Sequence, residues 1–186
     1  MSFLSYAKNF QGVGEIFMRD SKRYLPFVQL LDNVMSCESE MTQAQREMVA
    51  LYSSAVNSCN YCVGSHSSVL NSLGAQEDHV CSLAEGSLAQ VEDRMKEMLS
   101  FAQKLAVEPG KVVKADIDTV RAAGWSEQAI EDAICVVSTF AFLNRLVDGF
   151  GLEGNDAHFD QVGGMVSQQG YSPLVKMIEQ KASAAA

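Results

Sequence analysis

Two cysteines and a histidine lie within eight residues of this 186-residue chain. Cys59 and Cys62 are separated by two residues, and His66 follows after three more. The whole chain has five cysteines and three histidines, so this concentration asks for an explanation. Such a set can form a redox-active dithiol, can bind a zinc ion, or can be an accident of core packing, where cysteines are common.

A helix that begins at the first cysteine would bring these three side chains together. On a helix, Cys59, Cys62 and His66 occupy positions i, i+3 and i+7 and therefore share one face. With Ser58 as the N-cap, both cysteines lie in or beside the first turn, where unpaired N–H groups and the helix dipole stabilise a thiolate. A thiolate can attack a peroxide oxygen and become a sulfenic acid, which the second thiol converts to a disulfide.

Glu47 joins this set only if the chain turns between it and the first cysteine. In one straight helix Glu47 would lie ~18 Å from Cys59, at a rise of ~1.5 Å per residue. Asn57 and Ser58 are weak helix formers and predict a break, after which the two helices run antiparallel. Glu47 then lies ~13 Å back along one helix and His66 ~10 Å along the other, which brings them level. The sequence therefore predicts a Glu47–His66 hydrogen bond that orients the imidazole and holds a proton near the thiols.

Zinc is the second explanation for the cluster. Cys59, Cys62 and His66 would supply three ligands, and because structural zinc takes four, Cys81 or His79 would have to supply the last. The chain has no second Cys-x-x-Cys, which makes the zinc hypothesis the weaker one. A lone Cys-x-x-Cys in a core can also be without any chemistry. The three explanations stay open on these residues alone.

The elements that must position the cluster are helices. The chain has three prolines, and its apolar residues recur at helical rather than strand spacing. We expect helices at 23–35, 43–55, 59–73, 77–83, 91–107, 114–123, 127–150 and within 171–186. Thr42 and Ser126 are the expected N-caps of two of them. The sequence therefore predicts one all-α domain over residues 1–186, with the Cys-x-x-Cys at the N-terminus of a core helix.

An internal two-unit repeat is a further prediction. A shift of 84 residues places the first motif on the long apolar segment. The matched pairs are Thr42 with Ser126, Glu47 with Glu131, Ser54 with Ser138 and Asn60 with Asn144, whereas Cys59, Cys62 and His66 fall on Leu143, Leu146 and Phe150. This pattern predicts an active unit at about 20–90, a degenerate unit at about 91–155 and a C-terminal tail at 156–186.

Charge and composition exclude several classes of function. The net charge is −9 and no basic run interrupts it, so a nucleic acid would be repelled. The N-terminal residues lack the apolar stretch of a secretory signal, and no run approaches the ~18 apolar residues that span a membrane. We expect a cytoplasmic protein with reduced thiols, which also agrees with an odd number of cysteines.

The other cysteines and histidines have no partner at motif spacing. Cys135 lies in an apolar run, and we expect it, like Cys81, to be a buried small residue. His79 and His158 are expected at the surface.

The spacing of the cluster resembles that of a known family. The order Glu, eleven residues, Cys, two residues, Cys, three residues, His is similar to that of AhpD-like alkylhydroperoxidases in the carboxymuconolactone decarboxylase superfamily. The flanking text REMVALYSSAVNSCNYCVGSH also looks like that family, and FLNRLVDGFG looks like its peroxidase-related branch. The resemblance covers about residues 20–155, and it is sharp only over residues 42–73.

The resemblance implies a fold, an assembly and a set of roles. It implies an all-helical protein in trimers or hexamers, without a cofactor, reduced by a thiol reductant or a dithiol adaptor protein. Cys62 would be the peroxide-attacking thiol, Cys59 the resolving thiol, and Glu47 and His66 the proton relay. Well-studied members carry a second histidine between the cysteines, where this chain has Tyr61, a poor base near neutral pH. Members of the decarboxylase branch lack the Cys-x-x-Cys, so its presence argues against lactone decarboxylation.

The resulting hypothesis is a thiol-dependent peroxidase. It would reduce alkyl or hydrogen peroxides, and the long apolar helix around residues 133–147 would supply the apolar surface that an organic peroxide needs. The alternatives are a disulfide reductase or redox sensor without peroxidase turnover, and a structural zinc-binding domain.

Overall fold

The computed structural model describes residues 2–184. They form ten α-helices and two short 3-10 helices, with no strand among them, which confirms the predicted all-α class. The α-helices are α1 (Val13–Arg19), α2 (Ser21–Ser36), α3 (Gln43–Val56), α4 (Asn60–Ser72), α5 (Glu77–Ala84), α6 (Asp93–Val107), α7 (Lys114–Ala122), α8 (Glu127–Phe150), α9 (Asp156–Gln169) and α10 (Ser172–Ala184). The 3-10 helices are Ser5–Ala7 and Pro109–Lys111.

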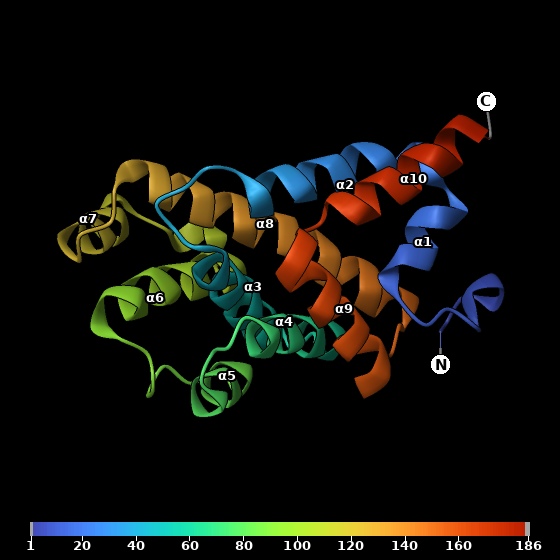
Figure 1. The fold of residues 1–186 in the computed structure, drawn as a ribbon. Helices are drawn as coiled ribbons and strands as arrows, with labels where there is room; N and C mark the ends of the chain where they lie inside the picture. Colours follow the sequence, from blue (N-terminus) through green and yellow to red (C-terminus); the bar gives the residue numbers. More distant parts are fainter. Residues whose placement is uncertain (1, 185–186) are drawn as a thin grey trace.

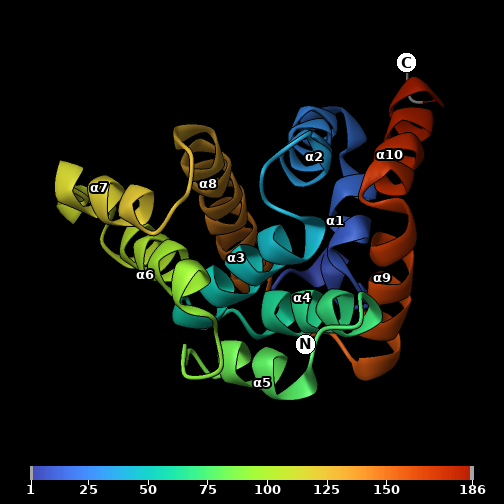
Figure 2. The same ribbon diagram turned by 60° about the vertical axis from the view of Figure 1, so that its left-hand side comes forward.

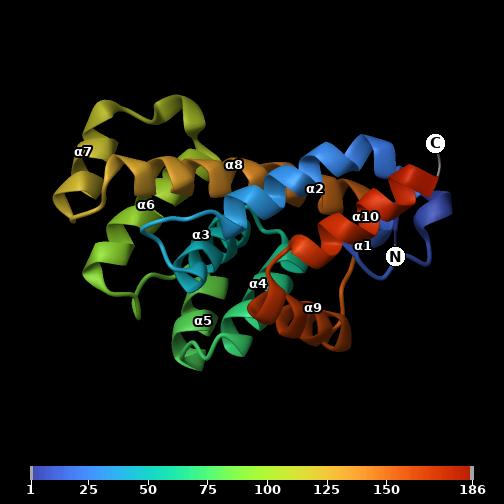
Figure 3. The same ribbon diagram turned by 45° about the horizontal axis from the view of Figure 1, so that its top comes forward.

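The helices pack around α8, which crosses the whole molecule (Figure 1). It contacts α2, α3 and α6 along its length. The C-terminal helices fold back onto the N-terminal half, α9 against α4 and α10 against α2 (Figure 2 and Figure 3). The segment predicted as a tail is therefore, as far as residue 184, part of the packed structure. Neither α1 nor α9 was expected from the sequence.

Local capping signals explain where the two central helices begin. Thr42 accepts a hydrogen bond from the Gln45 N–H at 3.2 Å, and the Gln45 side chain accepts one from the Thr42 N–H at 2.9 Å. This reciprocal pair is a capping box and starts α3. Ser126 accepts from the Ala129 N–H at 3.1 Å and starts α8. Both predicted N-caps are confirmed.

The predicted break between α3 and α4 is also confirmed, but its chemistry differs from expectation. Ser58 has a left-handed backbone with φ of 59°, a conformation that glycine usually supplies. The Cys59 N–H reaches the Ser54 carbonyl at 3.0 Å, and the Ser58 N–H reaches the Ala55 carbonyl at 2.9 Å, which together close α3. Cys59, not Ser58, is therefore the N-cap residue of α4, and the predicted Ser58 cap is wrong.

The long apolar helix shows no matching break. At the position that the 84-residue shift aligns with the break between α3 and α4, α8 continues as one helix of 24 residues. The two N-caps agree with the 84-residue shift, whereas the helix–break–helix arrangement is present in the first half alone. The two-unit repeat and its boundaries stay a prediction.

The apolar character of α8 reflects its place in the core. By length and composition it could cross a membrane, and 44% of its most apolar stretch is buried within the described residues. Two buried polar side chains on α8 are hydrogen-bonded inside the protein, Asp132 to Ser39 at 2.5 Å and Asn144 to Ser54 at 3.0 Å. These features are those of the core helix of a soluble helical protein.

Candidate active site

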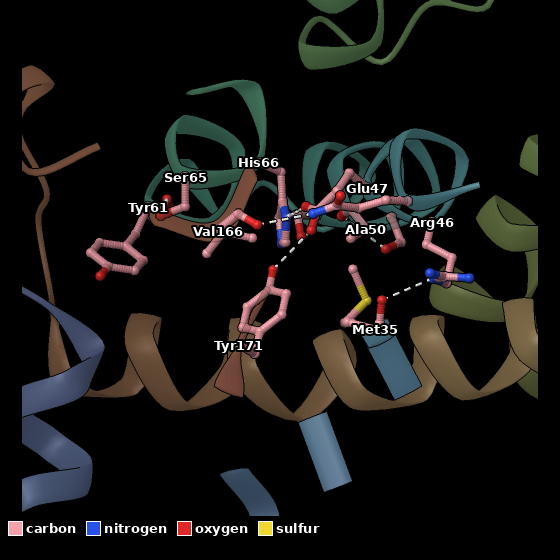
Figure 4. Close-up of polar contacts among 12 residues, drawn as sticks. Met35, Arg46, Glu47, Ala50, Tyr61, Ser65, His66, Val166 and Tyr171 are labelled. Carbon is pink, nitrogen blue, oxygen red and sulfur yellow. Dashed lines mark hydrogen bonds and ion pairs between the residues drawn. The ribbon is translucent and has the colours of Figure 1, made fainter. Parts of the chain in front are cut away.

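Glu47 and His66 meet between α3 and α4, as the break predicts. The His66 Nδ1 lies 2.6 Å from the Glu47 Oε2, and the two residues are 3% and 0% exposed. The second carboxylate oxygen accepts a hydrogen bond from the Tyr171 hydroxyl at 3.1 Å. Figure 4 shows the three side chains pointing toward one another. Because Nδ1 is held by the carboxylate, Nε2 is the imidazole nitrogen left for chemistry.

The two cysteines differ in what they face. Cys59 is 0% exposed at the start of α4, and Cys62 is 4% exposed in its first turn. Both are free thiols. Cys62 and His66 line one pocket of about 310 Å³, whereas Cys59 is not among its lining residues. A molecule in this pocket therefore meets the Cys62 sulfur and the His66 imidazole first.

The Cys62 thiol is not a preformed thiolate. Its pKa is raised well above the usual value, first by a hydrogen bond to Cys59 and then by burial. A hydrogen bond from the buried amide of Asn144 acts in the opposite direction. The expected stabilisation of a thiolate by the helix N-terminus is therefore wrong for Cys62, because burial and the neighbouring sulfur outweigh the dipole. The proton must be removed by a base.

The Asn144 amide is fixed at the break between α3 and α4. Its Nδ2 donates to the Ser54 hydroxyl at 3.0 Å, and its Oδ1 accepts from the Asn57 amide at 3.0 Å. It thereby joins α8 to the turn that positions the cysteines. Sequence analysis gave Asn144 no site role, although a lone amide inside an apolar helix was a usable signal.

The pocket is walled by apolar side chains from six helices, α1, α2, α4, α8, α9 and α10. Its lining residues are Val13, Gly14, Leu31, Tyr61, Cys62, Ser65, His66, Val69, Phe140, Leu143, Val147, His158, Gln161, Val162, Met165, Val166, Tyr171, Leu174 and Met177. None of these described residues is an Asp, Glu, Lys or Arg. As expected, α8 contributes apolar surface, through Phe140, Leu143 and Val147. The C-terminal pair α9 and α10 supplies much of the opposite wall, which the sequence did not indicate.

A second imidazole reaches the site through Tyr61. The Tyr61 hydroxyl accepts from the Val13 N–H at 3.0 Å and lies 2.8 Å from the His158 Nε2. Burial raises the pKa of Tyr61 to about 12 and lowers the pKa of His158 below its usual value. At neutral pH the Tyr61 hydroxyl therefore stays protonated and donates a hydrogen bond to the neutral imidazole of His158. His158 lies half-buried in the pocket wall, so its predicted surface position is wrong.

His158 is expected to make the fold less stable in mildly acidic solution. Because its pKa is lowered in the folded protein, the unfolded chain binds this proton at a higher pH than the folded one. The stability it contributes is complete above its ordinary pKa of ~6.5 and is lost as the pH falls through the lowered value. Between about pH 7.5 and 5.5, we expect urea unfolding to show a smaller loss of free energy of unfolding in His158→Gln than in wild type. Equal losses in the two proteins would contradict this assignment.

The model of the carboxymuconolactone decarboxylase family matches residues 24–104, which include the relay and both cysteines. Residues 24–104 are therefore similar to the carboxymuconolactone decarboxylase family. No curated protein matches it significantly.

Solved structures place this chain among AhpD-like folds. An uncharacterized peroxidase-related protein from Silicibacter sp. TM1040 is 24% identical, with a TM-score of 0.75 over 81% of this chain and 79% of that chain. The alkylhydroperoxidase AhpD core of an uncharacterized peroxidase-related protein from Ralstonia eutropha JMP134 is 25% identical, with a TM-score of 0.74 over 80% and 78%. A protein of unknown function from Agrobacterium tumefaciens is 17% identical, with a TM-score of 0.60 over 83% and 99%.

Residues outside the matched segment complete the site. Asn144, His158 and Tyr171 all lie beyond residue 104. They reach the site because α8 packs against α3 and α4, α9 packs against α4, and Tyr171 lies in the connection that follows α9. Motif spacing could not reveal them, since each lies 90 to 124 residues from its partner.

The other thiols of this chain lie apart from the site. Cys81 and Cys135 are exposed, so their predicted burial is wrong. Cys135 is exposed because the helical core covers one face of α8 and leaves its other face to solvent. Across residues 2–184, no three His, Cys, Asp or Glu side chains are placed to hold a metal ion.

Proposed function

We propose that this AhpD-like protein is a thiol-dependent peroxidase that reduces organic hydroperoxides with Cys62 and Cys59. One observation carries the proposal: Cys62 and His66 line the same apolar pocket, while Glu47 holds the far nitrogen of the imidazole. The pocket brings a substrate to the thiol, and the relay supplies the base that a protonated thiol requires. The peroxidase-related and AhpD-core neighbours support the same class of reaction.

The first half of the cycle consumes the peroxide. His66 Nε2 takes the proton of the Cys62 thiol, and Glu47 stabilises the imidazolium that forms. The thiolate attacks the terminal oxygen of the hydroperoxide, and the O–O bond breaks. The departing alkoxide takes the proton back from His66 and leaves as an alcohol. Cys62 is then a sulfenic acid, having lost two electrons to the peroxide.

The second half closes a disulfide. The Cys59 sulfur attacks the Cys62 sulfur, and the hydroxyl of the sulfenic acid leaves as water together with the Cys59 proton. The two cysteines lie at the start of the same helix, Cys59 as its N-cap and Cys62 in its first turn, where a CxxC pair can form a disulfide. A thiol reductant or a dithiol adaptor protein then returns two electrons and two protons.

The wall chemistry favours a neutral, apolar substrate. No charged side chain lies among the described lining residues, so a charged group placed there would be desolvated without a partner. Burying an apolar group of the size of a leucine side chain contributes about 1.5–3 kcal/mol, which corresponds to roughly tenfold or more in affinity. Hydrogen peroxide cannot use this surface.

Mass spectrometry of the reduced protein tests the proposal. One equivalent of cumene hydroperoxide is expected to convert the chain to a Cys59–Cys62 disulfide, about tenfold or more faster than hydrogen peroxide does. Peptide mapping assigns the bond, and Cys135→Ser, which removes an exposed thiol outside the site, should react at the wild-type rate. Thiols that stay reduced at this concentration would overturn the proposal.

Assembly and compartment belong to the same proposal. Phe142 on α8 is 45% exposed and stacks with Phe27 on α2 at 4.4 Å between ring centroids, beside Leu30, which is 51% exposed. An exposed apolar patch of this kind supports association of copies into trimers or hexamers. Light scattering after gel filtration measures the state. The free thiols agree with a cytoplasmic setting.

A further inference from the structure

Tyr171 is the one hydroxyl that reaches the buried carboxylate of the relay, within the described contacts of Glu47. It lies in the short connection between α9 and α10 and donates to the Glu47 Oε1 at 3.1 Å. Burial and the neighbouring Glu47 charge raise the pKa of Tyr171 well above its usual value. Its hydroxyl therefore keeps its proton and remains a donor across the working pH range.

The Glu47 carboxylate depends on hydrogen-bond donors from the protein because no solvent reaches it. Glu47 is 0% exposed, and its two oxygens are held by His66 and by Tyr171, one each. Donors that stabilise a carboxylate make the pair of carboxylate and imidazole bind a proton less tightly. The other titratable group that faces this cluster is Cys62 from α4. From α8, the ring of Phe140 packs edge-on against the imidazole at 4.3 Å between centroids.

The position of Tyr171 is set by the C-terminal helices. The Gln43 side chain on α3 donates to the Val166 carbonyl near the end of α9 at 3.0 Å, four residues before the connection. Tyr171 also lines the pocket that holds Cys62 and His66. The helices that cover the pocket thus also supply a hydrogen bond to the relay.

We infer that Tyr171 is a positioning residue that orients Glu47 and sets how tightly the Glu47–His66 pair holds its proton. The inference rests on the relay role that the proposed function gives to this pair. Tyr171 acts through Glu47 and is assigned no contact with the peroxide. Tyr171 lies between α9 and α10, which cover the pocket, and it also donates the hydrogen bond that affects how basic the Glu47–His66 pair is.

The test measures the imidazole directly. In isotope-labelled protein, the NMR titration midpoint of the His66 ring is expected to shift to higher pH by about one unit in Tyr171→Phe, a tenfold tighter proton. The phenylalanine keeps the ring in place and removes only the donor. Site-specific 3-fluorotyrosine at position 171, which has a more acidic hydroxyl, should move the midpoint in the opposite direction.

Tyr52→Phe is the matched control. Tyr52 lies on the same helix as Glu47, is 2% exposed, and bonds the Gln103 side chain at 3.0 Å, away from the relay. It should lower stability by a similar amount without moving the His66 midpoint. Unchanged midpoints in both Tyr171 variants, or equal shifts in Tyr171→Phe and Tyr52→Phe, would overturn the inference.

The titration separates this inference from the proposed function because it uses no peroxide. If the midpoint shifts as expected but wild-type thiols resist cumene hydroperoxide, the peroxidase proposal fails and the positioning role stands. If the thiols react and the midpoint does not move, the positioning role fails alone.

Discussion

Replacement of Cys62 by serine is expected to abolish oxidation of the site by an organic hydroperoxide. Cys62 is the cysteine that lines the pocket together with His66, whereas Cys59 lies behind it. Serine keeps the size of the side chain but removes the nucleophilic sulfur. After one equivalent of cumene hydroperoxide, intact mass spectrometry should show no added oxygen and no disulfide.

The complementary variant separates the two steps. Cys59→Ser leaves the attacking thiol and removes the resolving one, so a sulfenic acid should accumulate on Cys62 as a gain of about 16 Da. A dimedone adduct at Cys62 in the peptide map would locate it. If instead Cys62→Ser still takes up the oxygen on Cys59, the two roles are reversed and the pocket does not select the nucleophile.

Loss of the relay charge is expected to slow the first step by about a hundredfold or more at neutral pH, as general-base groups typically contribute at least that. Glu47→Gln keeps the shape of the side chain, and its amide can still accept from His66 and donate to Tyr171. What it removes is the negative charge that stabilises the imidazolium when His66 takes the Cys62 proton. Because the pKa of Cys62 is raised, few thiolates form without that base. Stopped-flow measurement of disulfide formation at pH 7 gives the rate.

Glu131→Gln is the matched control for this prediction. Glu131 is the residue that the 84-residue shift aligned with Glu47, and it lies exposed on α8. The same chemical change at that position should leave the rate unaltered. Equal rates for Glu47→Gln and wild type, with both folded, would show that Cys62 loses its proton by a route that does not involve the relay.

The local parts of the site were predictable from the sequence. Thr42 and Ser126 cap their helices through contacts within three residues. Such contacts depend only on neighbouring residues in the sequence. The break after Asn57 makes α3 and α4 antiparallel, and the helical rise then brings Glu47 level with His66. Because these relations span fewer than twenty residues, spacing alone was enough to predict them.

Two expectations failed where burial competed with a local rule. The helix N-terminus favours a thiolate, yet burial and the Cys59 sulfur raise the pKa of Cys62. Apolar neighbours in the sequence suggested burial of Cys135, yet only one face of α8 is covered. In both cases the deciding quantity is how much solvent the packed helices exclude, and periodicity does not report it.

By itself, then, the sequence of this protein determined most of the helices, though not α1 or α9, together with the Cys-x-x-Cys at a helix start and the Glu47–His66 contact. Only the tertiary structure decided what surrounds them: the amide of Asn144 beside Cys62, the Tyr61–His158 pair, and the Tyr171 hydroxyl on Glu47. The reason is physical. A hydrogen bond between residues that lie 80 or more positions apart depends on how whole helices pack, and that packing is chosen by the sum of many apolar contacts rather than by any local pattern.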